Sequence, residues 1–96
     1  MKFIFHPDAE AEFQNSIEYY EERQENLGYD FAFEVHCAIQ RAVDFPESWP
    51  TIKDEVRRSL VHRFPFGILY AIEEGSIVVV AVMHLHQQSD YWIGRI

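Results

Sequence analysis

Two neighbouring stretches in the last third of the chain, Phe66–Ile72 and Ile77–Leu85, are apolar at nearly every position. The Glu74-Gly75 pair between them predicts a tight turn, so the stretches are expected to pair as an antiparallel hairpin. A sheet with one face in water alternates apolar and polar residues, and neither stretch does so. One face must cover the domain's own core, and 96 residues leave little chain to cover the other. The pattern therefore predicts a partner protein on the second face of the sheet.

Strict alternation along each strand assigns its side chains to the two faces. In the first strand, Leu69 and Ala71 are expected to oppose a larger set, namely Phe66, Ile68, Tyr70 and Ile72. In the second strand, the even-numbered valines are expected to oppose the odd-numbered residues: Val78, Val80 and Val82 against Ile77, Val79, Ala81 and Met83.

The length of 96 residues fits one domain, so residues 1–96 are expected to form a single unit. The formal net charge of −8 is uneven, since residues 1–55 carry 13 acidic against 4 basic side chains and residues 56–96 carry 3 against 4. A surface of this sign repels phosphate backbones, which disfavours strong direct nucleic-acid binding. The longest apolar run, Ile77–Met83, is far shorter than the roughly 20 residues that cross a bilayer, so a cytoplasmic protein without a membrane anchor is expected.

The order of elements reads βααβββ, an α+β fold in which a helical hairpin packs on one face of a small, mainly antiparallel sheet of about four strands. Lys2–Phe5 reads as a strand, and His6-Pro7-Asp8 as the start of the first helix. Gly28 is expected to end that helix, Asp30 to cap the second, and Phe45-Pro46 to end the second. The expected core combines residues from both helices and both apolar strands: Phe13, Ile17, Tyr20, Phe31, Val35, Ile39, Leu69, Val79 and Ala81.

A further strand, expected over Val56–Phe64, carries most of the basic residues of the second half. Arginine offers a planar fork of donors that matches phosphate, so these residues form a candidate target- or anion-contacting ridge: Arg57, Arg58, His62 and Arg63, with Arg95 near the chain end. The same charges are also typical of a solvated edge strand that avoids pairing with another sheet. The sequence leaves both interpretations open.

His84 and His86 are expected to share one strand face, with His62 nearby. No acid or cysteine at ligand spacing accompanies them, so neither a metal nor another cofactor is expected. A histidine could act as general base in RNA cleavage if cations stood near the scissile phosphate. The acids of the first helix scatter around it and are interpreted as a solvated face. Trp49 and Trp92 could stack on bases, but Trp92 is better explained as an apolar cover over the sheet.

Several short motifs follow one another in a characteristic order and spacing: Tyr19-Tyr20-Glu21-Glu22, Phe45-Pro46, Val56-Arg57, Phe64-Pro65-Phe66-Gly67-Ile68-Leu69-Tyr70, Val80-Ala81-Val82-Met83-His84, Trp92 and Arg95. In this order the chain resembles the RelE/ParE superfamily, the toxin halves of bacterial toxin–antitoxin modules, also called plasmid stabilisation proteins. The resemblance covers essentially the whole chain. It implies a cognate antitoxin that wraps a partly disordered segment around the toxin and covers apolar surface.

The superfamily has two functional branches. RelE-like members cleave mRNA on the ribosome with basic and aromatic residues on the sheet, whereas ParE-like members lack that set and poison DNA gyrase. Many members carry arginine where Gly67 stands, and two arginines and a proline at the positions of His86, Gln87 and Ser89. Stabilising the transition state of phosphodiester cleavage relies on preorganised cations. These departures therefore favour a ParE-like toxin that is not a nuclease.

The ParE-like interpretation predicts binding to DNA gyrase and to a cognate antitoxin, and it allows a homodimer. The residues expected to bind a partner lie on the last strand and the tail: Val80, Val82, Met83, Tyr91 and Trp92. One alternative is a ribosome-dependent endoribonuclease, whose site would have to be built from His84, His86, Arg57, Arg63 and Tyr91. The other is a non-toxic family member that serves as an interaction domain.

Overall fold

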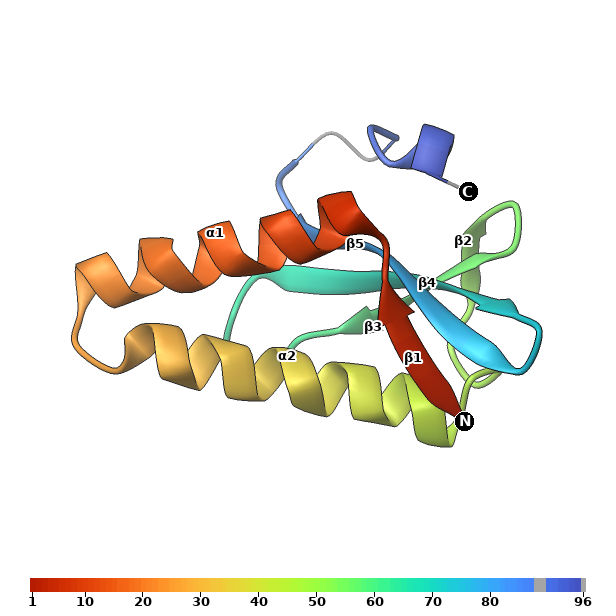
Figure 1. The fold of residues 1–96 in the computed structure, drawn as a ribbon, viewed down its shortest axis with the longest axis horizontal. Coiled ribbons are helices and arrows are strands. Elements are labelled where there is room, and N and C mark those ends of the chain that lie inside the picture. The colour runs from red at the N-terminus through yellow and green to blue at the C-terminus, as the bar shows by residue number, and fades with distance from the viewer. Residues whose placement is uncertain (88–89, 96) are drawn as a thin grey trace.

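The computed structural model describes residues 1–87 and 90–95, and it confirms the expected α+β fold. Its elements are β1 (Lys2–Phe5), α1 (Pro7–Arg23), α2 (Leu27–Asp44), β2 (Thr51–Lys53), β3 (Val56–Leu60), β4 (Phe66–Glu73), β5 (Ser76–His84) and the short 3-10 helix η1 (Ile93–Arg95). The strands form one sheet in the order β1-β5-β4-β3-β2, with β1 parallel to β5 and the other neighbours antiparallel. α1 and α2 lie side by side across one face of the sheet (Figure 1).

The sheet has five strands where the sequence predicted about four. The additional strand, β2, contains only Thr51–Lys53 and pairs with β3 at the edge of the sheet. All three of its residues are exposed, so it has no apolar periodicity that could have predicted it. β3 is shorter than expected and ends at Leu60, which leaves Arg63 outside the strand.

Both ends of the helical hairpin follow local sequence signals. His6 is the N-cap of α1, and its Nδ1 accepts from the Asp8 N–H at 3.1 Å, while Pro7 occupies the first turn as predicted. α2 ends at Asp44, directly before Phe45-Pro46, as predicted. No helix in the described ranges 1–87 and 90–95 is long and apolar enough to cross a membrane.

The connection between the two helices differs from the prediction. α2 begins at Leu27, and the left-handed residue in the connection is Asn26, with a φ of 70°. Gly28 lies inside α2, where a Cβ atom would stand 2.5 Å from the carbonyl oxygen of Ile17. The carboxylate of Glu21 accepts from the N–H groups of Asn26 and Gly28 at 2.9 and 3.0 Å, so it replaces the cap expected from Asp30. Gly28 therefore permits close contact between the helices and does not end the first one.

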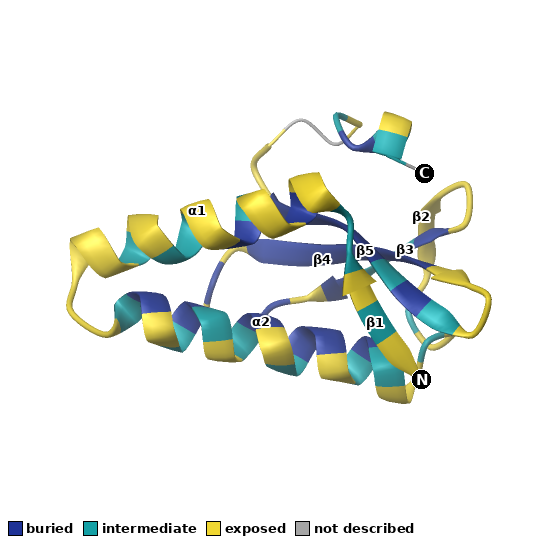
Figure 2. Cartoon of the chain, viewed as in Figure 1, coloured by how far each residue is buried: buried dark blue, intermediate teal, exposed yellow. Residues whose placement is uncertain are grey.

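The main core lies between the hairpin and the sheet and is rich in aromatic rings. The rings of Phe31 and Phe66 are 4.8 Å apart, and Tyr20 lies 4.9 Å from Phe64. Figure 2 shows the buried stripes of the helices and the buried strands β4 and β5. Of the nine expected core residues, Ile17 and Tyr20 are partly buried and the rest are buried. Leu69 and Ala81 belong to a second cluster, on the opposite face of the sheet.

A β-bulge in β5 overturns the predicted faces of that strand. Val80 is an extra residue, because its neighbours Val79 and Ala81 pair with consecutive residues of β4. The alternation predicted for β5 holds up to the bulge and is reversed beyond it. The helices consequently cover Ile77, Val79 and Val82, whereas the second face carries Val80, Ala81 and Met83.

Candidate functional site

The sheet face away from the helices carries a second apolar cluster, which the C-terminal segment covers. Trp92 is only 1% exposed and packs against this face, with Tyr91 and Ile93 at its border. The rest of the cluster comes from three strands: Val56, Leu69, Ala71, Val80, Ala81 and Met83. The interpretation of Trp92 as an apolar cover is confirmed. The expectation that the chain itself could not cover this face is wrong, because residues beyond β5 fold back over it.

Arg95 fastens the C-terminal segment to α1 and β5. Its guanidinium donates to the Val80 carbonyl oxygen at 3.0 Å and to Glu12 Oε2 at 2.9 Å, and it lies 3.6 Å from Asp8. The other carboxylate oxygen of Glu12 accepts from the Val82 N–H at 3.0 Å. The parallel pairing of β1 with β5 ends at Val79. Beyond it no strand covers this edge of β5, and the side chains of Arg95 and Glu12 bind its backbone groups instead.

Glu12 is a residue of this site that the sequence interpretation missed, since all acids of the first helix were assigned to a solvated face. Its side chain is only 21% exposed and pairs with Arg95. A signal was present in the sequence, because Asp8 and Glu12 are spaced one helical turn apart and can meet one cation together. Burial, with a further contribution from the Glu12 carboxylate, raises the pKa of the Tyr91 phenol well above its ordinary value. Tyr91 is thus a neutral member of this assembly.

The basic residues expected to form one ridge are divided between the two sheet faces. Arg57 pairs with Tyr70 on the helix side and donates to the carbonyl oxygens of Glu47 and Trp49, which braces the loop before β2. Arg58 lies on the opposite face, across Gly67, where a Cβ would meet its Cδ at 2.9 Å. The stem of Arg58 thus fills the space that a side chain at position 67 would need.

Arg63 and His62 lie in the turn between β3 and β4. Arg63 has a φ of 71°, its guanidinium is 3.5 Å from the Asp30 carboxylate, and it lies over the Phe64 ring at 5.5 Å. His62 is exposed. Arg95, the fifth basic residue of the expected ridge, lies in the C-terminal segment. The five residues therefore occupy separate places and form no continuous ridge.

His84 and His86 lie together at the end of β5. Their rings are 5.2 Å apart, and the His86 N–H donates to His84 Nδ1 at 3.1 Å. His84 also contacts the Phe66 ring edge-on, with 5.1 Å between the ring centres. Both residues border a cavity of about 360 Å³ that is also lined by Asn15, Ser16, Tyr19 and Tyr20. No group of three His, Cys, Asp or Glu side chains suited to a metal occurs among the residues that the structure describes.

The set proposed for ribonuclease chemistry is dispersed. His84 pairs with Phe66, whereas Arg57 pairs with Tyr70, four residues further along β4. At about 3.3 Å per residue the two positions are separated by roughly 13 Å along the strand. Tyr91 borders the cluster on the opposite sheet face. Ser89, which replaces a family proline, lies outside the described residues.

The residues expected to bind a partner are largely covered within the chain. Val80 and Met83 lie beneath Trp92, and the bulge turns Val82 toward the helices, so none of the three valine and methionine side chains is more than 3% exposed. The chain supplies its own cover over Val80 and Met83, and the β-bulge changes the face on which Val82 lies. Tyr91 is half-buried at the border of the same cluster.

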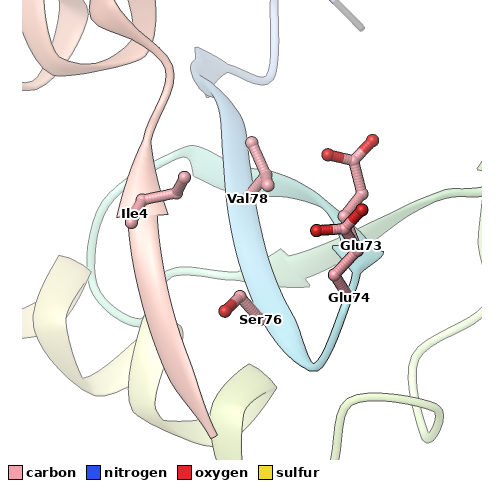
Figure 3. A pocket seen from close by; sticks show the side chains of 5 residues that line it. All are labelled: Ile4, Glu73, Glu74, Ser76 and Val78. Carbon is pink, nitrogen blue, oxygen red and sulfur yellow. The ribbon is translucent and has the colours of Figure 1, made fainter.

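At β1, part of the second face is uncovered. Ile4 is 58% exposed and pairs with half-buried Val78 of β5. Figure 3 shows these two side chains beside Ser76, with the carboxylates of Glu73 and Glu74 across an open hollow of about 520 Å³. An exposed apolar patch rimmed by polar groups is typical of a protein-binding surface. We call this surface, Ile4, Glu73, Glu74, Ser76 and Val78, the β1 hollow.

Comparison with known proteins gives the same family as the residue motifs. Residues 3–89 match the family described as the ParE toxin of type II toxin–antitoxin systems, parDE. A solved structure, the "Chromosomal ParDE TA system from P. aeruginosa", has a chain of the same fold, with a TM-score of 0.63 and 15% identity over 90% of this chain and 97% of that chain. No match was found among curated proteins. The family match spans most of the sequence, and the chain belongs to the ParE toxin family of type II toxin–antitoxin systems.

Proposed function

We propose that this ParE-family toxin acts in the cytoplasm by binding DNA gyrase and that a cognate antitoxin neutralises it. The family match over residues 3–89 supports a toxin role. The observation that carries the choice of a non-nuclease mode is the dispersal of the cations: Arg57 braces a loop, Arg63 pairs with Asp30, and Arg95 fastens the C-terminal segment. Each of these three guanidinium groups makes a contact elsewhere in the fold.

Cleavage of RNA needs a base, an acid for the leaving oxygen and cations for the developing charge. His84 and His86 could exchange protons, but Gly67 lies beneath the stem of Arg58 and contributes no cation. The net charge of −8 also opposes the approach of an RNA backbone, most strongly at low salt. Binding to a protein target makes none of these demands.

The antitoxin contact is proposed at the β1 hollow. Ile4 and Val78 are apolar residues on the second face that the C-terminal segment leaves at least partly exposed, and Val78 pairs with Ala71 of the cluster under Trp92. An extended antitoxin segment could also use the outer backbone edge of β1, because β1 ends the sheet on that side.

The target is tested with two assays run in parallel on the intact protein. In expressing cells, primer extension should show no codon-phased mRNA cuts, while the purified protein should inhibit supercoiling by gyrase. Codon-phased cuts that vanish in His84→Ala or Arg63→Ala variants would overturn the proposal in favour of a ribosome-dependent endoribonuclease. Absence of both effects, with no growth defect, would support a non-toxic interaction domain instead.

The antitoxin contact is tested by calorimetry with the product of the adjoining reading frame. Ile4→Asp should weaken binding about tenfold or more, because it places a charge in an apolar contact next to Glu73 and Glu74. Ile52→Asp is the matched control, since Ile52 is also exposed but lies on β2 at the opposite edge of the sheet. Equal affinity of the Ile4→Asp variant and the unchanged protein would refute this contact.

A further inference from the structure

The outer side of α2 carries an aromatic groove that belongs neither to the core nor to the β1 hollow. Tyr29 and Phe33 are 77% and 60% exposed and stand one helical turn apart. With Ala32 and His36 they line an open cavity of about 310 Å³. The His36 ring contacts Phe13 of α1 edge-on at 5.8 Å, so the cavity lies on the side of α2 that adjoins α1. We call Tyr29, Ala32, Phe33 and His36 the α2 groove.

These aromatic side chains are not needed by the fold. The buried residues of α2 lie along another side of the helix: Gly28, Phe31, Val35, Ala38, Ile39 and Ala42. Single exposed apolar residues are common on any protein. The rings of Tyr29 and Phe33 are both exposed and neighbour each other on the helix surface, so they form an apolar patch.

The charge around the groove is strongly one-sided. Residues 7–44, which span both helices, carry 10 acidic and 2 basic side chains, whereas the rest of the chain carries 6 of each. The hairpin therefore holds the entire net charge of −8. Asp30 and Glu34 stand beside Phe33 on α2 itself. A field of this sign attracts cations and repels other acidic surfaces.

The charge decides among the possible occupants. A second copy of this chain would bring two hairpins of −8 together, and a nucleic acid would add its own negative charge, so both are repelled. A cationic polypeptide meets an attractive field, and its Lys or Arg side chains can also stack on the rings. The hairpin already contains this geometry, since the guanidinium of Arg23 lies 4.0 Å from the centre of the Tyr19 ring.

We propose that the α2 groove binds a lysine- or arginine-rich amphipathic segment of a partner protein. Apolar side chains of the segment enter between Tyr29 and Phe33, and its basic side chains pair with the acids of the hairpin. The groove is on the helical side of the sheet, whereas the β1 hollow is on the other, so the two surfaces can be occupied together. The proposal does not depend on gyrase as target.

The probe is a synthetic helical peptide of Leu and Lys with its leucines on one face, compared with a twin in which Glu replaces every Lys. Chemical-shift mapping on the whole protein should show the Lys peptide at the α2 groove and no binding of the Glu twin. Affinity should fall with added salt. Phe33→Ser and Tyr29→Ser should each weaken binding about fivefold or more, because each removes a ring from the groove.

Phe45→Ser is the matched control. Phe45 is 65% exposed and ends the same helix, roughly 18 Å from Phe33 at about 1.5 Å per residue. It should leave affinity unchanged, and circular dichroism should show that all variants keep the fold. Unchanged affinity of both groove variants, or shifts spread evenly over the acidic hairpin, would overturn the proposal. Equal binding of the two peptides would do so as well, and so would self-association that Phe33→Ser abolishes.

Discussion

At the scale of single residues, Glu12 has the widest structural reach. Its two carboxylate oxygens accept from the Val82 N–H and from Arg95, so one side chain of α1 joins β5 to the C-terminal segment. A charge-assisted contact of this kind is stronger than one between neutral groups, and its partial burial protects it from screening. Glu12 holds Arg95, three residues after Trp92, and so helps to keep Trp92 over the second face. Most sequence neighbours of Glu12 are exposed.

Tyr70 predicts how stability should respond to alkaline pH. Its buried hydroxyl donates to the Pro46 carbonyl oxygen at 2.8 Å, and burial, opposed by the charge of Arg57, raises the pKa of Tyr70 from 10.0 to about 12. The folded state therefore keeps a proton that the unfolded chain releases first. Its contribution to stability is full below pH 10 and is lost as the pH rises toward 12.

Tyr70→Phe should accordingly cost about 1 kcal/mol at neutral pH through the lost hydrogen bond. Toward pH 12 the difference in the free energy of unfolding between the variant and the unchanged protein should shrink and then reverse, changing by roughly 2 kcal/mol in total. The reason is that the variant has no phenol at position 70 to ionise on unfolding. Urea titrations at a series of pH values measure it. Tyr29→Phe, at a position that is 77% exposed, should show no such change. A constant difference between Tyr70→Phe and the unchanged protein would contradict the assignment.

At the scale of elements, the parts set by local chemistry could be predicted from the sequence. The start of α1 at Pro7, the end of α2 before Phe45-Pro46 and the turn at Glu74-Gly75 all occur as expected, the last with φ values of 49° and 78°. Each depends on two or three adjacent residues. β2 and the bulge at Val80 could not be predicted, because an exposed edge strand and an extra residue leave no signal in the periodicity.

The candidate site was predicted less well than the fold, for the same reason. Trp92 was correctly interpreted as a cover, but the pairing of Arg95 with Glu12 joins residues 83 positions apart. Such a contact exists only after the sheet, the hairpin and the C-terminal segment have met. The exposure of Ile4 likewise depends on how much of the second face the C-terminal segment covers.

Gly28 provides a test at this scale, because helix propensity and packing predict opposite signs for the change in the free energy of unfolding caused by Gly28→Ala. In an isolated helix, Gly→Ala is stabilising by about 1 kcal/mol. Here the added Cβ would stand 2.5 Å from the Ile17 carbonyl oxygen and 2.9 Å from the Glu21 Cβ, so the helices must separate. Gly28→Ala should therefore lower the free energy of unfolding by about 1–3 kcal/mol in urea titrations.

Gly94→Ala is the control for this substitution. A Cβ at Gly94 meets nothing within 4 Å, and its φ needs no glycine, so the change should stay within about 0.5 kcal/mol. A stabilising Gly28→Ala variant would show that the two helices do not pack as closely as the structure has them.

At the scale of the whole molecule, the net charge is separated from the sheet. The helical hairpin carries the full net charge of −8, and the neutral remainder contains the sheet, four of the six arginines and the C-terminal segment. The β1 hollow, an apolar pair rimmed by Glu73 and Glu74, and the aromatic α2 groove on the acidic hairpin lie on opposite faces of the sheet, so they can bind separate partner segments.

The same separation predicts that salt stabilises the protein. The ten acids of the helical hairpin repel one another over distances that water alone screens poorly at low ionic strength. Raising NaCl from about 10 mM to about 200 mM shortens the screening length from roughly 30 Å to below 10 Å, so the midpoint of thermal unfolding should rise. A double variant, Glu18→Gln with Glu22→Gln, should be more stable at low salt and should gain less from NaCl, since both residues are exposed on α1. The opposite trend, a midpoint that falls with salt, would mean that the pairing of Arg95 with Glu12 and Asp8 outweighs the repulsion within the hairpin.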